Sequence, residues 1–325
     1  MHDHVRYLSK VLTKMENDIL IGSREGIMTS TAAVPVTRPT EFESVWSDLQ
    51  GVAFSQGYLD VAGVRTRYLH AGDESLPALV LLHGSGGHAE AYVRNLASHA
   101  ERFSTWSIDM LGHGYTDKPG HPLEVAHYVE HLIGFLDTIG AQRAHISGES
   151  LGGWVAARTA VDHPDRVDRL VLNTAGGSQA DPDVMKRIIT LSMAAAENPT
   201  WETVQARIKW LMADKTKDYS DIVASRQRIY RQPGFVAAMS DIMALQDPDI
   251  RARNILGPRE YGSITARTLV VWTSDDPTAD VAEGRRIAGM IPGARFEVMQ
   301  GCGHWPQYED PDTFNRLHLD FLLKG

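Results

Sequence analysis

The sequence around Ser150 has the residue types that a serine nucleophile requires. Residues 148–153 read GESLGG and follow the pattern G-x-S-x-G. A short apolar segment, 144–147, precedes this string, and a helix-forming segment rich in small residues follows it. A strand-to-helix turn of this kind strains the serine backbone and lifts its hydroxyl above a sheet, and its glycines leave room for the tight turn. We therefore predict that Ser150 is a nucleophile rather than only the N-cap of a helix.

A serine hydroxyl needs a base to accept its proton, and the base needs an acid to orient it. The chain order expected for such a site is serine, acid, histidine. Asp276 follows a predicted strand at 268–272, and His304 follows the last predicted strand. Because ligand sites of α/β sheets lie at the carboxyl ends of the strands, these two side chains are the predicted acid and base. Asp275 and Asp280 remain alternative acids.

A glycine-rich loop is the predicted site of oxyanion stabilisation. The apolar segment 78–82 runs into the string HGSGG at 83–87. The expected donors are the backbone N–H groups of Ser85 and of Leu151, the residue after the nucleophile. A simple turn is the alternative interpretation of this loop. We interpret His83 as a structural partner of the loop, not as a base.

Short apolar segments alternate with helical ones along most of the chain. Segments that are apolar on both faces are typical of strands in a buried parallel sheet, and alternation with helices predicts a doubly wound, mostly parallel α/β sheet. Two alternating segments, 52–60 and 64–70, predict an antiparallel hairpin at its start. The predicted strands are 78–82, 103–108, 144–147, 169–172, 268–272 and 296–299, and the predicted helices are 127–139, 151–162 and 311–323.

About 95 residues separate two of the predicted strands, which is too long for a simple crossover. Helical periodicity dominates this interval, at 184–195, 201–212, 219–231 and 234–245. We predict a helical insertion, the cap (residues 178–264), that covers the sheet. The core domain is then 51–177 together with 265–325.

Residues 1–50 form a predicted N-terminal helical extension with a linker. An apolar stripe with helical spacing is made by Val5, Leu8, Leu12, Met15 and Ile19, and the polar segment 22–39 follows it. The helix packs either on the chain's own body or on a second copy, so a homo-oligomer through this helix is one hypothesis. Met28 is an alternative candidate for the start of the chain.

The composition excludes several classes of function. The net charge of −9 disfavours nucleic-acid binding, which needs a basic surface. The sequence has no apolar run long enough for a membrane span or a signal peptide. Its one cysteine, Cys302, cannot form an internal disulfide or a cysteine-rich metal site. We expect a cytoplasmic enzyme without a metal or other cofactor, with the pair His2 and His4 solvated.

These motifs together resemble the α/β-hydrolase-fold serine hydrolases, from about residue 56 to residue 325. The string DMLGHG at 109–114 is similar to a D-x-x-G-x-G loop of that family, and HPDRV at 163–167 is similar to its link after the nucleophile helix. The resemblance implies an α/β-hydrolase fold and a small-molecule substrate.

A closer resemblance is to the meta-cleavage-product hydrolases, which hydrolyse a C–C bond in 2-hydroxy-6-oxo-dienoates. It rests on PTWET at 199–203, on Arg226 with RQP at 231–233, and on the tail 302–321. The resemblance implies that Arg226 binds the substrate carboxylate and that Trp305 follows the catalytic histidine. Arg228 and Arg231 remain alternatives to Arg226. The predicted substrate contacts are Gly84, Glu149, Arg226 and Trp305.

The chain departs from that family at two places. Glu149 stands where the family often has Asn, and the loop after His83 and Gly84 is shorter and reads HAEA at 88–91. A carboxylate before the nucleophile opposes an anionic substrate unless it is protonated or turned away. A carboxylesterase with the same triad is therefore the alternative function. A small-molecule receptor on a hydrolase scaffold is a remote third hypothesis.

Overall fold

The computed structural model describes residues 44–177 and 181–324, which form an α/β fold around one eight-stranded sheet. The strand order is β1-β2-β4-β3-β5-β6-β7-β8. β2 is antiparallel to both β1 and β4, and the remaining strand pairs are parallel. The doubly wound, mostly parallel sheet expected from the sequence is confirmed. The strands are β1 Phe54–Val61, β2 Val64–Ala71, β3 Ala78–Leu82, β4 Ser104–Ile108, β5 Ala144–Glu149, β6 Val167–Asn173, β7 Arg267–Thr273 and β8 Arg295–Met299.

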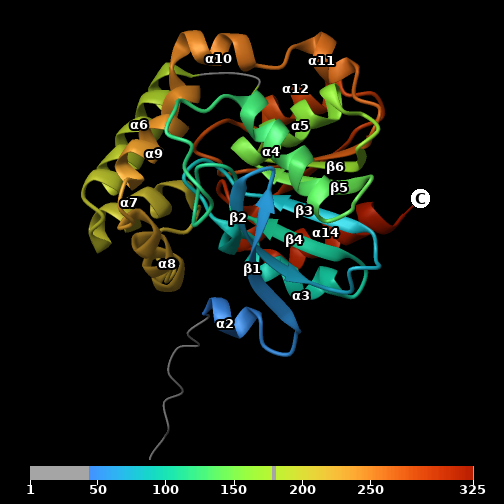
Figure 1. The fold of residues 1–325 in the computed structure, drawn as a ribbon. Helices are drawn as coiled ribbons and strands as arrows, with labels where there is room; N and C mark the ends of the chain where they lie inside the picture. The colour runs from blue at the N-terminus through green and yellow to red at the C-terminus, as the bar shows by residue number, and fades with distance from the viewer. Residues whose placement is uncertain (1–43, 178–180, 325) are drawn as a thin grey trace, which may run out of the picture. The chain divides into compact units, whose positions relative to one another are not determined.

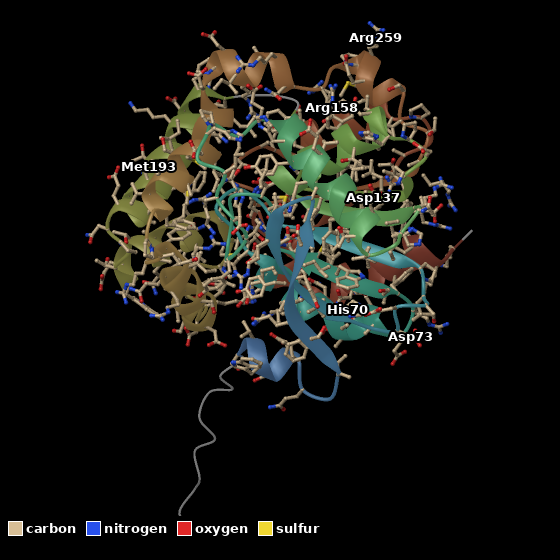
Figure 2. The ribbon with its side chains drawn as sticks, viewed as in Figure 1. His70, Asp73, Asp137, Arg158, Met193 and Arg259 are labelled. Carbon is tan, nitrogen blue, oxygen red and sulfur yellow. The ribbon has the colours of Figure 1, made fainter. Side chains whose placement is uncertain are left out.

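Helices cover both faces of this sheet (Figure 1). α3 and α14 pack together on one face, and α4, α5 and α12 cover the other. Charged side chains such as Asp137 of α4 and Arg158 of α5 point away from the sheet (Figure 2). The core helices are α3 Val93–Ala100, α4 Val125–Thr138, α5 Leu151–Asp162, α12 Val281–Met290, α13 Pro306–Glu309 and α14 Pro311–Leu323.

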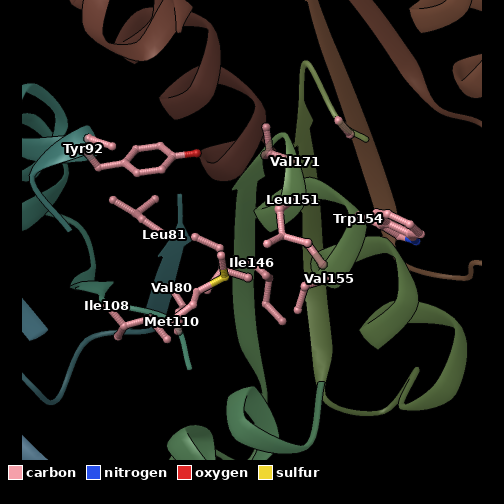
Figure 3. Close-up of a cluster of buried hydrophobic side chains, with 14 of the residues drawn as sticks. Val80, Leu81, Tyr92, Ile108, Met110, Ile146, Leu151, Trp154, Val155 and Val171 are labelled. Atoms are coloured by element: carbon pink, nitrogen blue, oxygen red, sulfur yellow. The ribbon is translucent and has the colours of Figure 1, made fainter. Parts of the chain in front are cut away.

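The central strands are buried because their side chains are apolar on both faces. Val80 and Leu81 of β3, Ile146 of β5 and Val171 of β6 are 0–1% exposed, and Figure 3 shows them in one cluster. Burying apolar area contributes about 25 cal/mol per Å², so this cluster fixes the strands that carry the site. Leu151, the first residue of α5, packs onto the same cluster (Figure 3).

The segment between β6 and β7 is helical, as the periodicity predicts, and its first four helices gather beyond one end of the sheet (Figure 1). Two short helices, α10 and α11, were not predicted. Each begins at a proline directly after its N-cap residue and is too short to show a helical period. The helices of the cap are α6 Pro182–Glu197, α7 Trp201–Leu211, α8 Ser220–Tyr230, α9 Phe235–Met243, α10 Pro248–Asn254 and α11 Pro258–Gly262.

The N-terminal helix and the linker predicted within residues 1–43 lie outside the described residues. The short helix α2 (Val45–Asp48) contacts one helix of the cap and one helix of the core. The Val45 N–H donates to Asp221 of α8 at 2.6 Å, and Asp48 lies 3.3 Å from Arg94 of α3. Among the described residues, no helix is long and apolar enough to cross a membrane.

Candidate active site

Ser150 occupies a sharp turn between β5 and α5, with φ of 54° and ψ of −116°. A positive φ strains a residue that has a Cβ, and the surrounding structure must hold it there. The Ser150 N–H donates to the Asn173 carbonyl at 3.1 Å, which ties the turn to β6. A Cβ at Gly152 would lie 2.2 Å from the Leu82 carbonyl oxygen, so the close packing of α5 on β3 requires glycine there. The turn has the geometry expected of a nucleophile elbow.

The structure brings the predicted base and the predicted acid together. His304 Nδ1 lies 2.9 Å and 3.0 Å from the two carboxylate oxygens of Asp276. The backbone N–H and the hydroxyl of Thr278 also donate to Asp276 Oδ1, at 2.8 Å and 2.7 Å. The alternative acids lie elsewhere: Asp275 is exposed and accepts from Ser274, and Asp280 caps α12.

Two backbone contacts hold the His304 loop in place. The Thr174 hydroxyl donates to the His304 carbonyl at 2.9 Å, from a residue that is itself strained at φ 43°. The His304 N–H donates to the carbonyl of Leu211, the last residue of α7, at 2.7 Å. The predicted base is therefore fixed by the core on one side and by the cap on the other. No sequence motif marked Thr174, whereas Thr278 could have been found from the turn-forming pattern D-x-T.

Glu149 is the last residue of β5, and its carboxylate reaches the second ring nitrogen of His304. The side chain is 1% exposed, and its Oε1 lies 3.2 Å from His304 Nε2. Burial by itself lowers the pKa of His304, but the negative charges of Asp276 and Glu149 together raise it to about 10. His304 is therefore flanked by carboxylates at both nitrogens, which the sequence did not predict.

One pocket is lined by Ser150, Glu149 and His304; we call it the Ser150 pocket. It lies at the carboxyl ends of the strands and is covered by the cap, as expected for this kind of sheet. Both predicted oxyanion donors, Ser85 and Leu151, line it, as does Gly84. The other lining residues of the core are Glu149, Ser150, Trp154, 174–176, Thr278, Ala279, Glu283, His304 and Trp305. Those of the cap are Asp181, Val184, Met185, Ile188, Arg207, Leu211, Gln246 and Arg251.

His83 has a structural place beside the pocket. Its Nδ1 lies 2.8 Å from the Gly84 carbonyl, and its Nε2 accepts the Met110 N–H at 3.1 Å. Burial lowers the pKa of His83 to about 3, so the ring is neutral and holds the loop. Cys302 is buried, and burial raises the pKa of its thiol to about 12, which disfavours a cysteine nucleophile.

Of the three candidate arginines, Arg226 is the one that faces inward. Arg228 and Arg231 are exposed, whereas Arg226 is 1% exposed and its guanidinium carbon lies 4.9 Å from the centre of the Trp305 ring. Its Nε and Nη2 are buried without a hydrogen-bond partner among the described residues. Trp305 lines the Ser150 pocket, whereas Arg226 lies over the Trp305 ring and is not one of the residues that line the pocket.

A second buried arginine, Arg207 of α7, lines the pocket and was not predicted. An arginine within a helical period suggests a solvated face from sequence alone, but α7 packs against α6 and α8, and Arg207 is buried there. Within the described chain, no group of three or more His, Cys, Asp or Glu side chains could hold a metal ion. His2 and His4 lie outside that part.

The model of the alpha/beta hydrolase family matches residues 79–317. The chain belongs to this family. It is a hydrolase, and similarity to individual proteins extends over most of its length. It is 30% identical to the 2-hydroxy-6-oxo-6-phenylhexa-2,4-dienoate hydrolase of Comamonas testosteroni over 81% of this chain and 93% of that protein.

Two further comparisons agree with this assignment. The 2-hydroxy-6-oxononadienedioate/2-hydroxy-6-oxononatrienedioate hydrolase of Paraburkholderia phymatum is 32% identical, over 78% of this chain and 88% of that protein. A solved structure of the meta-cleavage product hydrolase from Pseudomonas fluorescens IP01 has 27% identity and a TM-score of 0.73, over 83% of this chain and 97% of that one. The resemblance predicted from the motifs is confirmed.

Proposed function

We propose that this hydrolase cleaves the C5–C6 bond of a 2-hydroxy-6-oxo-dienoate with Ser150, Asp276 and His304 as its triad. The names of the relatives described above support this choice of substrate. The hydrogen bonds between His304 and Asp276 support the assignment of base and acid. The positive φ of Ser150 supports its assignment as nucleophile.

The reaction consumes one water and divides the substrate into two acids. The dienoate first tautomerises to the 2,6-dioxo form, in which the 2-hydroxyl has lost its proton and C5 has gained one. The Ser150 hydroxyl then adds to the C6 ketone or activates a water that adds to it. His304 accepts the proton of that nucleophile, and Asp276 holds the ring in the required tautomer. The N–H groups of Ser85 and Leu151 stabilise the oxyanion at C6, a contribution of about 3–4 kcal/mol for each donor. Cleavage of C5–C6 leaves the electron pair on a dienolate, which takes the proton from His304 and leaves as a 2-hydroxydienoate; the carboxylic acid that contains C6 is released directly, or by water when Ser150 has been acylated.

The guanidinium of Arg226 carries the proposal, because its buried Nε and Nη2 have no hydrogen-bond partner in the part of the chain that the structure describes. A buried charge is costly unless an anion accompanies it. A substrate carboxylate that reaches Arg226 would supply this anion, whereas a neutral ester would leave Arg226 unpaired. The carboxylate of a dienoate therefore complements the positive charge of Arg226 beside Trp305.

The replacement Arg226→Ala tests this role. Loss of a buried, charge-assisted contact typically costs 2–5 kcal/mol, so kcat/KM for a dienoate should fall by about 30-fold or more. The value for p-nitrophenyl acetate, which has no carboxylate, should fall much less. Arg228→Ala, on the exposed side of the same helix, is the matched control. Equal losses for both substrates would mean that Arg226 supports only the packing of the cap.

Glu149 is the observation that favours a carboxylesterase as the second candidate. A carboxylate beside the nucleophile opposes an anionic substrate and does not oppose a neutral ester. For a dienoate hydrolase, Glu149→Asn should therefore increase turnover of the dienoate by more than it changes turnover of a neutral ester. In an enzyme that acts on neutral esters, Arg226→Ala would leave the best substrate nearly unaffected, and Glu149→Asn would change ester and dienoate turnover by the same factor, through its effect on His304.

A further inference from the structure

Arg207 presents a second cation to the Ser150 pocket, from a different helix than Arg226. It is 4% exposed and lines the pocket. Its Nε donates to the Ser192 hydroxyl of α6 at 3.0 Å, which fixes the side chain, while its Nη1 is buried with no hydrogen-bond partner among the described residues. The guanidinium is therefore held in position by its Nε, and its Nη1 can still donate a hydrogen bond to a ligand.

The charge of Arg207 has no partner in the described part of the chain. Burial lowers its pKa to about 10, which still leaves it protonated at neutral pH. Tyr230 and the carboxylate of Glu149 interact with it electrostatically and favour its charged form, but among the described residues neither forms an ion pair or hydrogen bond with it. Arg226 is also within electrostatic reach and adds repulsion. A buried cation of this kind is expected to receive its anion from a ligand.

We propose that Arg207 binds a second anionic group of the substrate, on the C6 side of the cleaved bond, so that the preferred substrate is a dicarboxylate. This inference rests on the proposed function, in which Arg226 takes the first carboxylate. The two guanidiniums are held by different elements: Arg226 stands over Trp305 of the core, and Arg207 is tied to α6. Arg226 acts electrostatically on Arg207, so the two cations lie in one region, and each is available to a separate carboxylate of one substrate.

An apolar group on the C6 side fits the same region less well. Met185, Ile188 and Leu211 of the pocket wall would accept a phenyl ring. Such a ring would also exclude water from Arg207 without giving its guanidinium an anion, which is unfavourable. A carboxylate, in contrast, can form two parallel hydrogen bonds with a guanidinium.

Turnover of matched substrates tests the inference. Two 2-hydroxy-6-oxo-dienoates are compared, one with a terminal carboxylate beyond C6 and one with a methyl group in its place. In the unmodified enzyme, kcat/KM should be higher for the dicarboxylate, and Arg207→Met should reduce the ratio of the two values by about 30-fold or more. Lys209→Met removes a charge from the same helix outside the pocket and should not change the ratio. An unchanged ratio in Arg207→Met, with equal losses on both substrates, would overturn the inference.

Binding of small acids separates this inference from the proposed function. Succinate and butyrate have the same chain length and differ by one carboxylate. Succinate should bind the unmodified enzyme more tightly than butyrate in calorimetric titration. Arg207→Met should abolish this difference, while Arg207→Lys keeps part of it.

If dienoates are not cleaved but succinate is still preferred through Arg207, the proposed function fails and the second anion site stands. If dienoates are cleaved and Arg207→Met leaves the preference intact, the second anion site fails alone. A thermal melt of each variant verifies that it is folded.

Discussion

The environment of His304 determines when the predicted base can act. A general base must be deprotonated, and the negative charges of Asp276 and Glu149 raise the pKa of His304 to about 10 although burial lowers it. At neutral pH the free enzyme therefore holds most of its His304 as the cation. Because the fraction of neutral His304 increases as the pH approaches this pKa, kcat/KM should rise with pH through the neutral range.

Removing the charge of Glu149 should move this dependence. An opposite charge within 4–6 Å shifts a pKa by about 1–3 units, and Glu149 Oε1 lies 3.2 Å from His304 Nε2. In Glu149→Gln the pKa of His304 should fall, so the acidic limb of the kcat/KM profile should move to lower pH by about one unit or more. The measurement is hydrolysis of p-nitrophenyl acetate between about pH 5 and pH 10, since this substrate does not titrate. If the acidic limb of the kcat/KM profile lay at the same pH in Glu149→Gln and in the unmodified enzyme, Glu149 would not act on His304.

The choice between neighbouring carboxylates can also be tested one residue at a time. Asp276 accepts from His304 at 2.9 Å, whereas Asp275 is exposed. Asp276→Asn should lower kcat by about 10³-fold or more, because the amide favours the wrong tautomer of the ring. Asp275→Asn should change kcat little. A larger loss in Asp275→Asn would transfer the role of the acid to that residue.

The end of α7, in the cap, and the loop before α13, in the core, form a close backbone contact. Glu309 joins them: one carboxylate oxygen accepts the Gly303 N–H at 2.9 Å, and the other accepts the Ala213 N–H at 2.7 Å. A Cβ at Gly303 would lie 2.3 Å from the Leu211 carbonyl oxygen. The cap can therefore hold the His304 loop only because residue 303 is glycine.

Gly303→Ala should force these two segments apart. Overpacking of a tight contact costs about 1–3 kcal/mol, so the free energy of unfolding should fall by about that amount, and kcat/KM should fall about tenfold or more as His304 is displaced. Gly289→Ala is the matched control, since a Cβ there meets nothing within 4 Å. Urea unfolding and steady-state kinetics measure both effects. An active, equally stable Gly303→Ala enzyme would contradict the proposed coupling of cap and loop.

The longer elements could be predicted because their patterns are local. β3 and β7 are apolar on both faces, and α14 follows its predicted bounds, 311–323. α10 and α11 could not be predicted, since each is shorter than two turns and depends on contacts outside itself. The strained backbone of Thr174 had no local signal either, because it comes from the way β6 meets the His304 loop.

Across the whole molecule, motifs predicted which groups meet but not how their side chains point. The elbow and the two later loops predicted Ser150, Asp276 and His304, because each follows a strand of one sheet, and the contact of Asp276 with His304 is observed. The contact of Glu149 with His304 and the burial of Arg207 depend on packing between segments far apart in the chain, which no single motif encodes. The N-terminal helix and an oligomer formed through it stay predictions.

The central claim is that Ser150 serves hydrolysis of a C–C bond in an acidic substrate. The most direct test measures kcat/KM for a 2-hydroxy-6-oxo-dienoate and for p-nitrophenyl butyrate on one preparation, with Ser150→Ala beside it. We predict that the dienoate is the better substrate and that Ser150→Ala lowers its kcat by several orders of magnitude, because the triad acts as a unit. A faster reaction with the ester, or a Ser150→Ala enzyme that keeps more than about a tenth of its activity, would contradict the claim.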